Sequence, residues 1–248
     1  MNLSNLFSEA ADKVLASFEP KDHLNKELWN GFTLKPIVRK KLLAIAKEYY
    51  KSLNLKKDVV IKDIVFTGSN ANFNWSSTKY SDIDLHLKIE YDDIDENSDL
   101  VTEYMFDKKA LWNKTHNIKI YGYDVELFAQ DASQDAPFDA GVYSLTQGEW
   151  LQQPKEGIFK FNSKEVLDKT KQLEQEANRL FKTKDVSKVD DIDRLKERIQ
   201  KLRKDTVTKG GEFDPSNLAY KYLRRKKILD KLTDLKTRIL DRELTLSK

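Results

Sequence analysis

Residues 64–89, IVFTGSNANFNWSSTKYSDIDLHLKI, decide the fold that this chain is expected to adopt. The first three residues are apolar and rich in β-branched side chains, which is typical of a buried strand. Gly68-Ser69 ends that run, and a polar segment of twelve residues, 70–81, follows it. From residue 83 to residue 89 apolar and polar side chains alternate strictly, which predicts a second strand with one buried face.

Two carboxylates stand side by side at the start of the second predicted strand. Asp82 and Asp84 are two residues apart, so their side chains project from the same face. Like charges at this spacing repel each other unless a cation lies between them. Ligands that offer only oxygen atoms suit Mg²⁺ or Mn²⁺. The pair is therefore a candidate metal site, although a lone Asp-x-Asp on a strand is more often a solvated face.

A third carboxylate is expected on a later strand. Residues 118–120 and 125–128 are predicted to form a hairpin around Gly122. Asp124 and Glu126 are again two apart and share a face. Glu126 is preferred as the third ligand because apolar residues flank it, whereas Asp124 follows Tyr121-Gly122-Tyr123 and also suits a turn. The choice between these two residues stays open at the level of sequence.

Gly68-Ser69 lies directly after the first predicted strand, at the position of a turn. Glycine lets the backbone approach a ligand closely, and serine offers a hydroxyl and an N–H group to phosphate oxygens. Taken alone, the pair also fits an ordinary turn. The combined order favours a site for a nucleotide and a metal ion: a strand, Gly-Ser, a polar loop, an Asp-x-Asp strand, and a further strand with carboxylates.

This order of motifs resembles the DNA polymerase β-like nucleotidyltransferase superfamily. The residues that carry the resemblance are Phe66–Ser69, Ser81–Leu85 and Val125–Leu127, within residues 64–128. Further stretches are similar to an uncharacterised branch that is common among phage and bacterial proteins: Trp29-Asn30-Gly31, Ala71–Trp75 and Val142–Leu145. The resemblance implies a short mixed sheet with flanking helices, followed by a C-terminal helical domain that closes the cleft.

The same resemblance implies the roles of the site residues. Asp82, Asp84 and Glu126 would be the catalytic carboxylates and would hold Mg²⁺ (or Mn²⁺). Gly68 and Ser69 would bind the nucleoside triphosphate, ATP being one candidate, and Ser81 is assigned to the same nucleotide site. The expected reaction transfers a nucleoside monophosphate to an acceptor hydroxyl and releases pyrophosphate. The acceptor is not specified: an RNA end, another nucleotide, a protein side chain or a small molecule all fit.

The charge of the chain is divided unevenly. Residues 1–150 contain 18 Lys and Arg against 24 Asp and Glu, whereas residues 151–248 contain 26 against 17. An acidic half is suited to holding cations, and a basic half to facing phosphates. Lys221, at the start of the densest basic cluster, is the candidate for contacting the triphosphate, by analogy with related enzymes. A wider alternative is nucleic-acid contact through the basic half, although its interleaved acidic residues favour ion-paired helices.

The organisation of the chain predicts an α+β protein. Helices are expected over residues 3–18, from Pro36 to about Leu53 with Ile37 among the inward residues, and over residues 100–114. From about Ser163 onward the spacing of apolar residues predicts two helices and then, after Gly210-Gly211, one final helical stretch. We expect a catalytic domain over residues 1–155, including the N-terminal helices, and a helical domain over residues 156–248.

Composition excludes several other classes of function. The chain has no cysteine, which excludes disulfides, zinc thiolate sites and thiol nucleophiles. No signal peptide and no apolar run of about 20 residues is found, so a cytoplasmic protein without a membrane partner is expected. Two alternatives to the enzyme stay open. One is a non-catalytic sensor or interaction module that binds a nucleotide or metal, and the other is an RNA-modifying toxin-like or antitoxin-like member.

Overall fold

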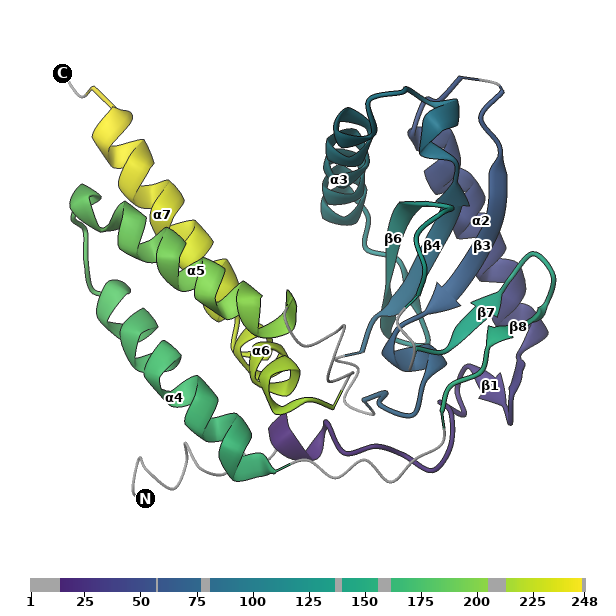
Figure 1. The fold of residues 1–248 in the computed structure, drawn as a ribbon, viewed down its shortest axis with the longest axis horizontal. Coiled ribbons are helices and arrows are strands. Elements are labelled where there is room, and N and C mark those ends of the chain that lie inside the picture. The colour runs from purple at the N-terminus through teal and green to yellow at the C-terminus, as the bar shows by residue number, and fades with distance from the viewer. Residues whose placement is uncertain are drawn as a thin grey trace. The chain divides into compact units, whose positions relative to one another are not determined.

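The computed structural model describes residues 14–56, 58–76, 81–136, 140–155, 162–204 and 213–246 (Figure 1). These residues form two compact units: one contains residues 17–155, and the other combines residues 14–16 with residues 162–246. The first unit is built around a mixed sheet and the second is helical, so the expected α+β class is confirmed. The predicted domain boundary after residue 155 stays a prediction. Most of the helix expected over residues 3–18 lies outside the described residues.

A six-stranded sheet forms the centre of the first unit, in the order β5-β6-β4-β3-β7-β8. β4 and β6 are parallel and the other neighbouring strands are antiparallel, which makes the sheet mixed. The strands are β3 (Ile61–Thr67), β4 (Ile83–Ile89), β5 (Lys119–Ile120), β6 (Tyr123–Asp131), β7 (Val142–Ser144) and β8 (Glu149–Gln152). A separate ribbon pairs β1 (Trp29–Asn30) with β2 (Thr33–Leu34).

The two faces of this sheet differ because apolar and polar residues alternate along β4, as the sequence predicts. The apolar residues of β4 join one core with residues from α2 (Pro36–Ser52) and α3 (Ser98–Thr115). The alternate positions, Asp84, His86 and Lys88, are half-buried and lie on the opposite face. The sheet thus has a helix-covered face and a polar face, and the crossover from β4 to the parallel β6 includes α3.

Helix α2 begins at Pro36 as predicted, because proline has no N–H to leave unsatisfied at a first helical position. The expectation that Ile37 points inward is wrong, since this side chain is 53% exposed. The buried stripe begins one residue later and consists of Val38, Leu42, Ala46 and Tyr49. Steps of four, four and three residues keep these side chains on one face of the helix.

The predicted hairpin around Gly122 is confirmed as β5 and β6. Tyr121 and Gly122 have φ angles of 50° and 85°, and two central residues with positive φ match the right-handed twist of the strands. Residues 142–145, which the sequence leaves open as a short strand or the start of a helix, contain the strand β7. β8 was not expected from the sequence, because its half-exposed and exposed residues give no apolar run.

An aromatic cluster ties the β1 ribbon to the sheet. Trp29 is 1% exposed and stacks on Phe66 of β3 and on Trp150 of β8, with ring centroids 5.4 and 4.8 Å apart. Tyr143 meets the edge of the same indole at 5.2 Å. The indole N–H of Trp29 donates a 2.8 Å hydrogen bond to the backbone carbonyl of Asn70. The cluster therefore anchors the turn that follows β3.

The second unit contains α4 (Ser163–Leu180), η3 (Val186–Lys188), α5 (Val189–Lys204), α6 (Pro215–Arg225) and α7 (Ile228–Leu244). The final helical stretch expected from the apolar spacing is two helices, because Lys227 adopts a left-handed φ of 56° between them. Several ion pairs cross this unit, such as Lys226 with Glu174 at 2.8 Å and Lys236 with Asp193 at 2.6 Å. No helix in the described part of the chain is apolar over a length that would span a bilayer.

Removing the Trp29 ring tests the anchoring role of the aromatic cluster. Trp29→Ala is expected to lower the free energy of unfolding by about 3–5 kcal/mol, because a fully buried indole leaves a cavity. All four tryptophans of the chain lie within residues 29–150, so urea unfolding followed by tryptophan fluorescence reports on the sheet unit. Leu151→Ala, at a side chain that is 52% exposed, is the control and should change the value by less than about 0.5 kcal/mol. Equal losses in the two variants would contradict the anchoring role.

Candidate functional site

Three neighbouring strands, β3, β4 and β6, bring two of the predicted carboxylates to the same level on the polar face. Thr67, the last residue of β3, pairs with Asp84 in β4, and Asp84 pairs in turn with Glu126 in β6. Asp84 and Glu126 occupy the half-buried alternate positions of their strands, so both lie on the polar face. Asp82 stands just before β4 and is half-buried as well. Gly68 follows Thr67, so the Gly-Ser turn begins at the same level.

Gly68 lies directly against the carboxylate of Asp84. Its φ of +75° is in the region that residues with a side chain rarely adopt. A Cβ atom at this position would stand 1.8 Å from Asp84 Oδ2 and 2.7 Å from Asp84 Cγ, far inside van der Waals contact. The left-handed backbone therefore favours glycine here, and any side chain would have to displace the Asp84 carboxylate. The turn after β3 and the second carboxylate of the Asp-x-Asp pair are a single packed feature.

Asn70 joins the two halves of the site, and sequence reasoning did not single it out. It is fully buried in the short helix η1 (Ser69–Ala71). Its Nδ2 donates to the backbone carbonyl of Asp82 at 2.9 Å and to that of Ser81 at 3.2 Å. Its Oδ1 accepts a 2.8 Å hydrogen bond from Asn25 Nδ2. Asn70 thereby holds the segment before β4 against the turn after β3.

A second glycine, Gly141, leaves room for this turn on its other side. A Cβ atom at Gly141 would lie 1.9 Å from the backbone carbonyl oxygen of Ala71, so a side chain here would require the backbone to shift. The hydroxyl of Thr67 also donates a 2.9 Å hydrogen bond to the carbonyl of Gly141. The sequence contains only one weak signal for this contact, a glycine just before the apolar run at residue 142.

The residues predicted to bind the nucleotide lie in different surroundings. Ser69 is half-buried in the turn, directly after Gly68. Ser81 is 6% exposed, and its Oγ accepts a 2.8 Å hydrogen bond from the backbone N–H of Ser76, which fixes the end of the loop. Lys221 is half-buried in α6, which belongs to the helical unit. The nucleotide-binding roles of Ser69, Ser81 and Lys221 stay predictions.

The two candidates for the third carboxylate differ in their partners. Asp124 lies opposite Lys119 in the β5–β6 pair, and the ammonium and carboxylate groups of these residues form an ion pair. Both side chains of that pair are nearly half exposed. Glu126 is one step further into the sheet, directly beside Asp84. The ion pair gives Asp124 a partner away from the Asp-x-Asp pair, and the choice of Glu126 as the third ligand stays a prediction.

His86 continues the polar face one step beyond Asp84. Its Nδ1 lies 2.8 Å from Gln130 Oε1 and donates to it, and its ring meets the edge of Phe128 at 5.7 Å. Burial of the imidazole, reinforced by the positive charges of Lys109 and Lys88, lowers the pKa of His86 from 6.5 to about 4. The imidazole is therefore neutral at physiological pH. The hydrogen bond to Gln130 gives this neutral ring a fixed orientation.

The carboxylates match a divalent cation in chemistry, but their side chains do not converge in this structure. Among the residues that the structure describes, no three Asp, Glu, His or Cys side chains come close enough together to hold a metal ion. The donors are nonetheless all oxygen, as Mg²⁺ and Mn²⁺ require. Two of them, Asp84 and Glu126, are paired neighbours on adjacent strands. The backbone thus sets the donors in place, and the directions of the side chains do not complete a site.

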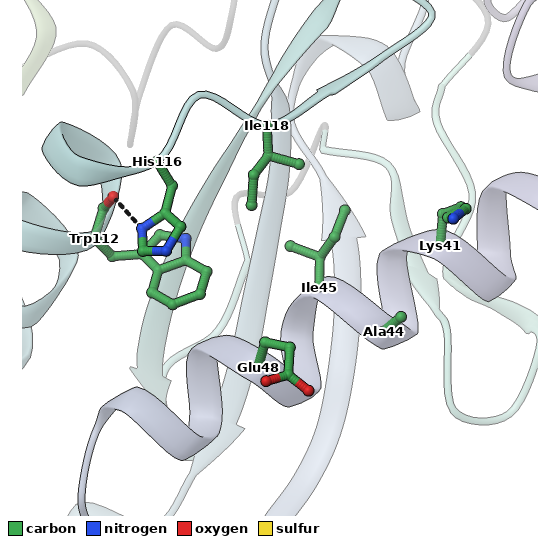
Figure 2. A pocket seen from close by; sticks show the side chains of 7 residues that line it. All are labelled: Lys41, Ala44, Ile45, Glu48, Trp112, His116 and Ile118. Atoms are coloured by element: carbon green, nitrogen blue, oxygen red, sulfur yellow. Dashed lines mark hydrogen bonds between the residues drawn. The ribbon is translucent and has the colours of Figure 1, made fainter.

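A pocket of about 490 Å³ lies elsewhere in the same unit (Figure 2). It is lined by Lys41, Ala44, Ile45, Glu48, Trp112, His116 and Ile118. Figure 2 shows the His116 ring lying over Trp112, with a 3.1 Å hydrogen bond from Nδ1 to the Trp112 carbonyl. These residues come from α2, α3 and the segment after α3, on the helix-covered side of the sheet. The pocket is therefore separate from the carboxylates.

Comparisons with known proteins give one structural similarity. No protein-family model matches the chain, and no curated protein sequence matches it. Among solved structures, the chain is similar to a STING-associated CdnE c-di-GMP synthase from Capnocytophaga granulosa. The identity is 14% and the TM-score is 0.21, with 85% of this chain and 84% of that chain covered. A TM-score of this size does not establish a shared activity.

A substitution at Gly68 tests the contact with Asp84. Gly68→Ala is expected to cost about 1–2 kcal/mol of stability for the left-handed backbone and about 1–3 kcal/mol more for the collision with the carboxylate. Gly31→Ala is a matched control, because Gly31 has a φ of +57° but nothing within 4 Å of an added Cβ. Urea unfolding followed by tryptophan fluorescence measures both values. If the two variants lose the same stability, the Asp84 contact does not constrain residue 68.

The lowered pKa of His86 predicts a dependence of stability on pH. Between pH 6.5 and about 4 the unfolded chain binds a proton at His86 that the folded chain does not bind. Folded stability is therefore lost as pH falls through this window, with a slope of up to about 1.4 kcal/mol per pH unit from this group. His86→Gln should show a shallower loss between pH 6.5 and 5 in metal-free buffer. The same slope in both proteins would rule out a buried neutral imidazole.

Proposed function

We propose that this chain is a metal-dependent nucleotidyltransferase, which transfers a nucleoside monophosphate from a nucleoside triphosphate to an acceptor hydroxyl. The observation that carries the proposal is the register Thr67–Asp84–Glu126, with Gly68 packed against the Asp84 carboxylate. That register sets a tight glycine turn, suited to phosphate, beside two carboxylates on one sheet face. An ordinary solvated Asp-x-Asp strand has no need of a glycine forced against its carboxylate.

The proposed roles follow from position. Asp82, Asp84 and Glu126 would hold Mg²⁺ (or Mn²⁺), because hard cations prefer carboxylate oxygens. When bound, the cation would supply charge neutralisation and would lower the pKa of an attacking hydroxyl. The turn Gly68-Ser69 faces the triphosphate with its backbone N–H groups and the serine hydroxyl. Ser81 supports the nucleotide site by fixing the loop that joins the turn to the Asp-x-Asp pair.

The reaction is a displacement at the α-phosphorus. An oxygen of the acceptor forms a new bond to phosphorus while the bond to the bridging oxygen of the β-phosphate breaks, and pyrophosphate leaves. The proton of the acceptor hydroxyl passes to a carboxylate oxygen at this edge. We further propose that Lys221 of the helical unit contacts the triphosphate. Nucleic-acid contact by that unit is a weaker proposal, because basic residues such as Lys226 and Lys236 already pair with carboxylates.

Turnover of labelled nucleoside triphosphates tests the proposal. The protein is incubated with each of the four α-³²P-labelled triphosphates and Mg²⁺, and labelled products and pyrophosphate are measured. Asp82→Asn/Asp84→Asn is expected to lower the rate by at least about 100-fold, because the charge that holds the cation is lost. Asp92→Asn/Asp93→Asn, two exposed carboxylates of η2 (Tyr91–Asp93), is the matched control and should keep the wild-type rate.

Single substitutions decide the third ligand within the same assay. Glu126→Gln should abolish turnover, whereas Asp124→Asn should retain most of it, because Asp124 is paired with Lys119. The reverse result would assign Asp124 as the ligand. Equal rates in the wild type and in the Asp82/Asp84 double variant would contradict the assignment of this site as the active site of an enzyme. Triphosphate binding without turnover of any acceptor would assign a nucleotide-binding module instead.

A further inference from the structure

An aromatic and cationic patch lies next to the carboxylates on the polar face of the sheet. Phe128 follows Glu126 by two residues in β6, so its ring is on the same face about 7 Å further along the strand. His86 pairs with Phe128 across the parallel strands and packs against its ring edge. Phe106 and Lys109 of α3 complete what we call the α3 patch: His86, Phe106, Lys109 and Phe128.

Phe106 is the exposed ring of the α3 patch, whereas His86 and Phe128 are half-buried. Phe106 lies 5.6 Å from Phe128, with an angle of 38° between the ring planes, and its side chain is 55% exposed. The ammonium group of Lys109 stands over the Phe128 ring, 5.2 Å from its centroid. Gln130 holds the His86 imidazole through a 2.8 Å hydrogen bond. The patch therefore offers the exposed ring of Phe106 near the positive charge of Lys109, in a half of the chain that is acidic.

The position of the α3 patch relative to the Gly68-Ser69 turn indicates which substrate the patch would contact. The Gly-Ser turn follows β3, on one side of β4, while Phe128 lies in β6, on the other side. In a displacement at phosphorus the attacking and leaving oxygens are roughly in line on opposite sides of the phosphorus atom. If the leaving pyrophosphate is held by the turn after β3, the attacking hydroxyl enters from the side of β6. The α3 patch is on that side.

We infer that the α3 patch binds the acceptor and that the acceptor carries a nucleobase, stacked on Phe106 beside Phe128, with a phosphate next to Lys109. This inference rests on the proposed function. Aromatic faces accept any nucleobase, and a cation placed beside them attracts the neighbouring phosphate. A free nucleotide and the end of an RNA chain share this chemistry. The experiment therefore compares both sources.

Equilibrium binding in metal-free buffer tests the inference without requiring turnover. The probes are AMP, the trinucleotide ApApA and ribose 5-phosphate, which has no base, and each is titrated into the full chain by calorimetry or NMR. Phe106→Ala is expected to weaken the binding of AMP or ApApA by about 5- to 150-fold, the range for loss of one stacked base. Leu111→Ala is the matched control, since Leu111 is an exposed apolar residue of the same helix, 59% exposed.

The outcomes separate the base from the phosphate and one source from the other. Ribose 5-phosphate should bind more weakly than AMP and should be unaffected by Phe106→Ala. Lys109→Gln should weaken all three probes, while Lys114→Gln, an exposed lysine of the same helix, should leave them unchanged. Whichever of AMP and ApApA binds more tightly, and loses more in Phe106→Ala, identifies the source. Unchanged affinities in Phe106→Ala, or equal binding of AMP and ribose 5-phosphate, overturn the inference.

Kinetics distinguish failure of this inference from failure of the proposed function. In the labelled-triphosphate assay, Phe106→Ala should raise the KM of the nucleotide acceptor while leaving the KM of the donor triphosphate unchanged. If the wild type is active and the acceptor KM is equal in both proteins, the α3 patch does not bind the acceptor, while the enzyme assignment stands. An inactive wild type would contradict the proposed nucleotidyltransferase activity. The binding titrations would still decide whether the α3 patch binds a nucleobase.

Discussion

The contact between the backbone of Gly68 and the carboxylate of Asp84 is the constraint on which the rest of the site depends. A side chain at residue 68 would displace the Asp84 carboxylate, so glycine is favoured in the turn after β3. The turn then needs support from the inside, which the buried amide of Asn70 provides through the backbone of residues 81 and 82. It needs clearance on the other side, which Gly141 provides. The close approach of the turn after β3 to β4 thus connects three segments that are apart in sequence: the turn itself, residues 81–82 and Gly141.

Much of the fold could be predicted because local pattern and tertiary environment agree. Strict alternation in β4 reflects one helix-covered and one polar face, and Pro36 suits the first turn of a helix, where no N–H is needed. Predictions failed where the outcome depends on partners or on a single backbone angle. Ile37 has the right chemistry for a core but lies one residue outside the buried stripe. The break between α6 and α7 rests on a left-handed lysine, Lys227, which apolar spacing does not reveal.

In the candidate site, too, local pattern could be predicted from the sequence, whereas contacts with distant partners could not. Asp82, Asp84 and Glu126 could be proposed because their spacing and order are visible along the chain, and the register sets Asp84 beside Glu126. Asn70 could not be recognised, since its importance comes from Asn25, which is 45 residues away. The choice between Glu126 and Asp124 stays a prediction, and the structure adds that Asp124 pairs with Lys119. A role that depends on a partner distant in the sequence, as for Asn70, cannot be recognised from residue type alone.

The central place of β4 in the sheet has a consequence for the energetics of ligand binding. β4 is hydrogen-bonded on both sides, by β3 and β6, and the apolar side chains on its helix-covered face are fully buried. Amides in such a strand exchange their hydrogens only through large unfolding events, so this backbone is among the most protected parts of a unit. Asp84 and Glu126 therefore stand on strand backbone that does not have to fold when a ligand binds. For these two residues the entropy lost on binding comes from side-chain rotamers and not from coupled folding.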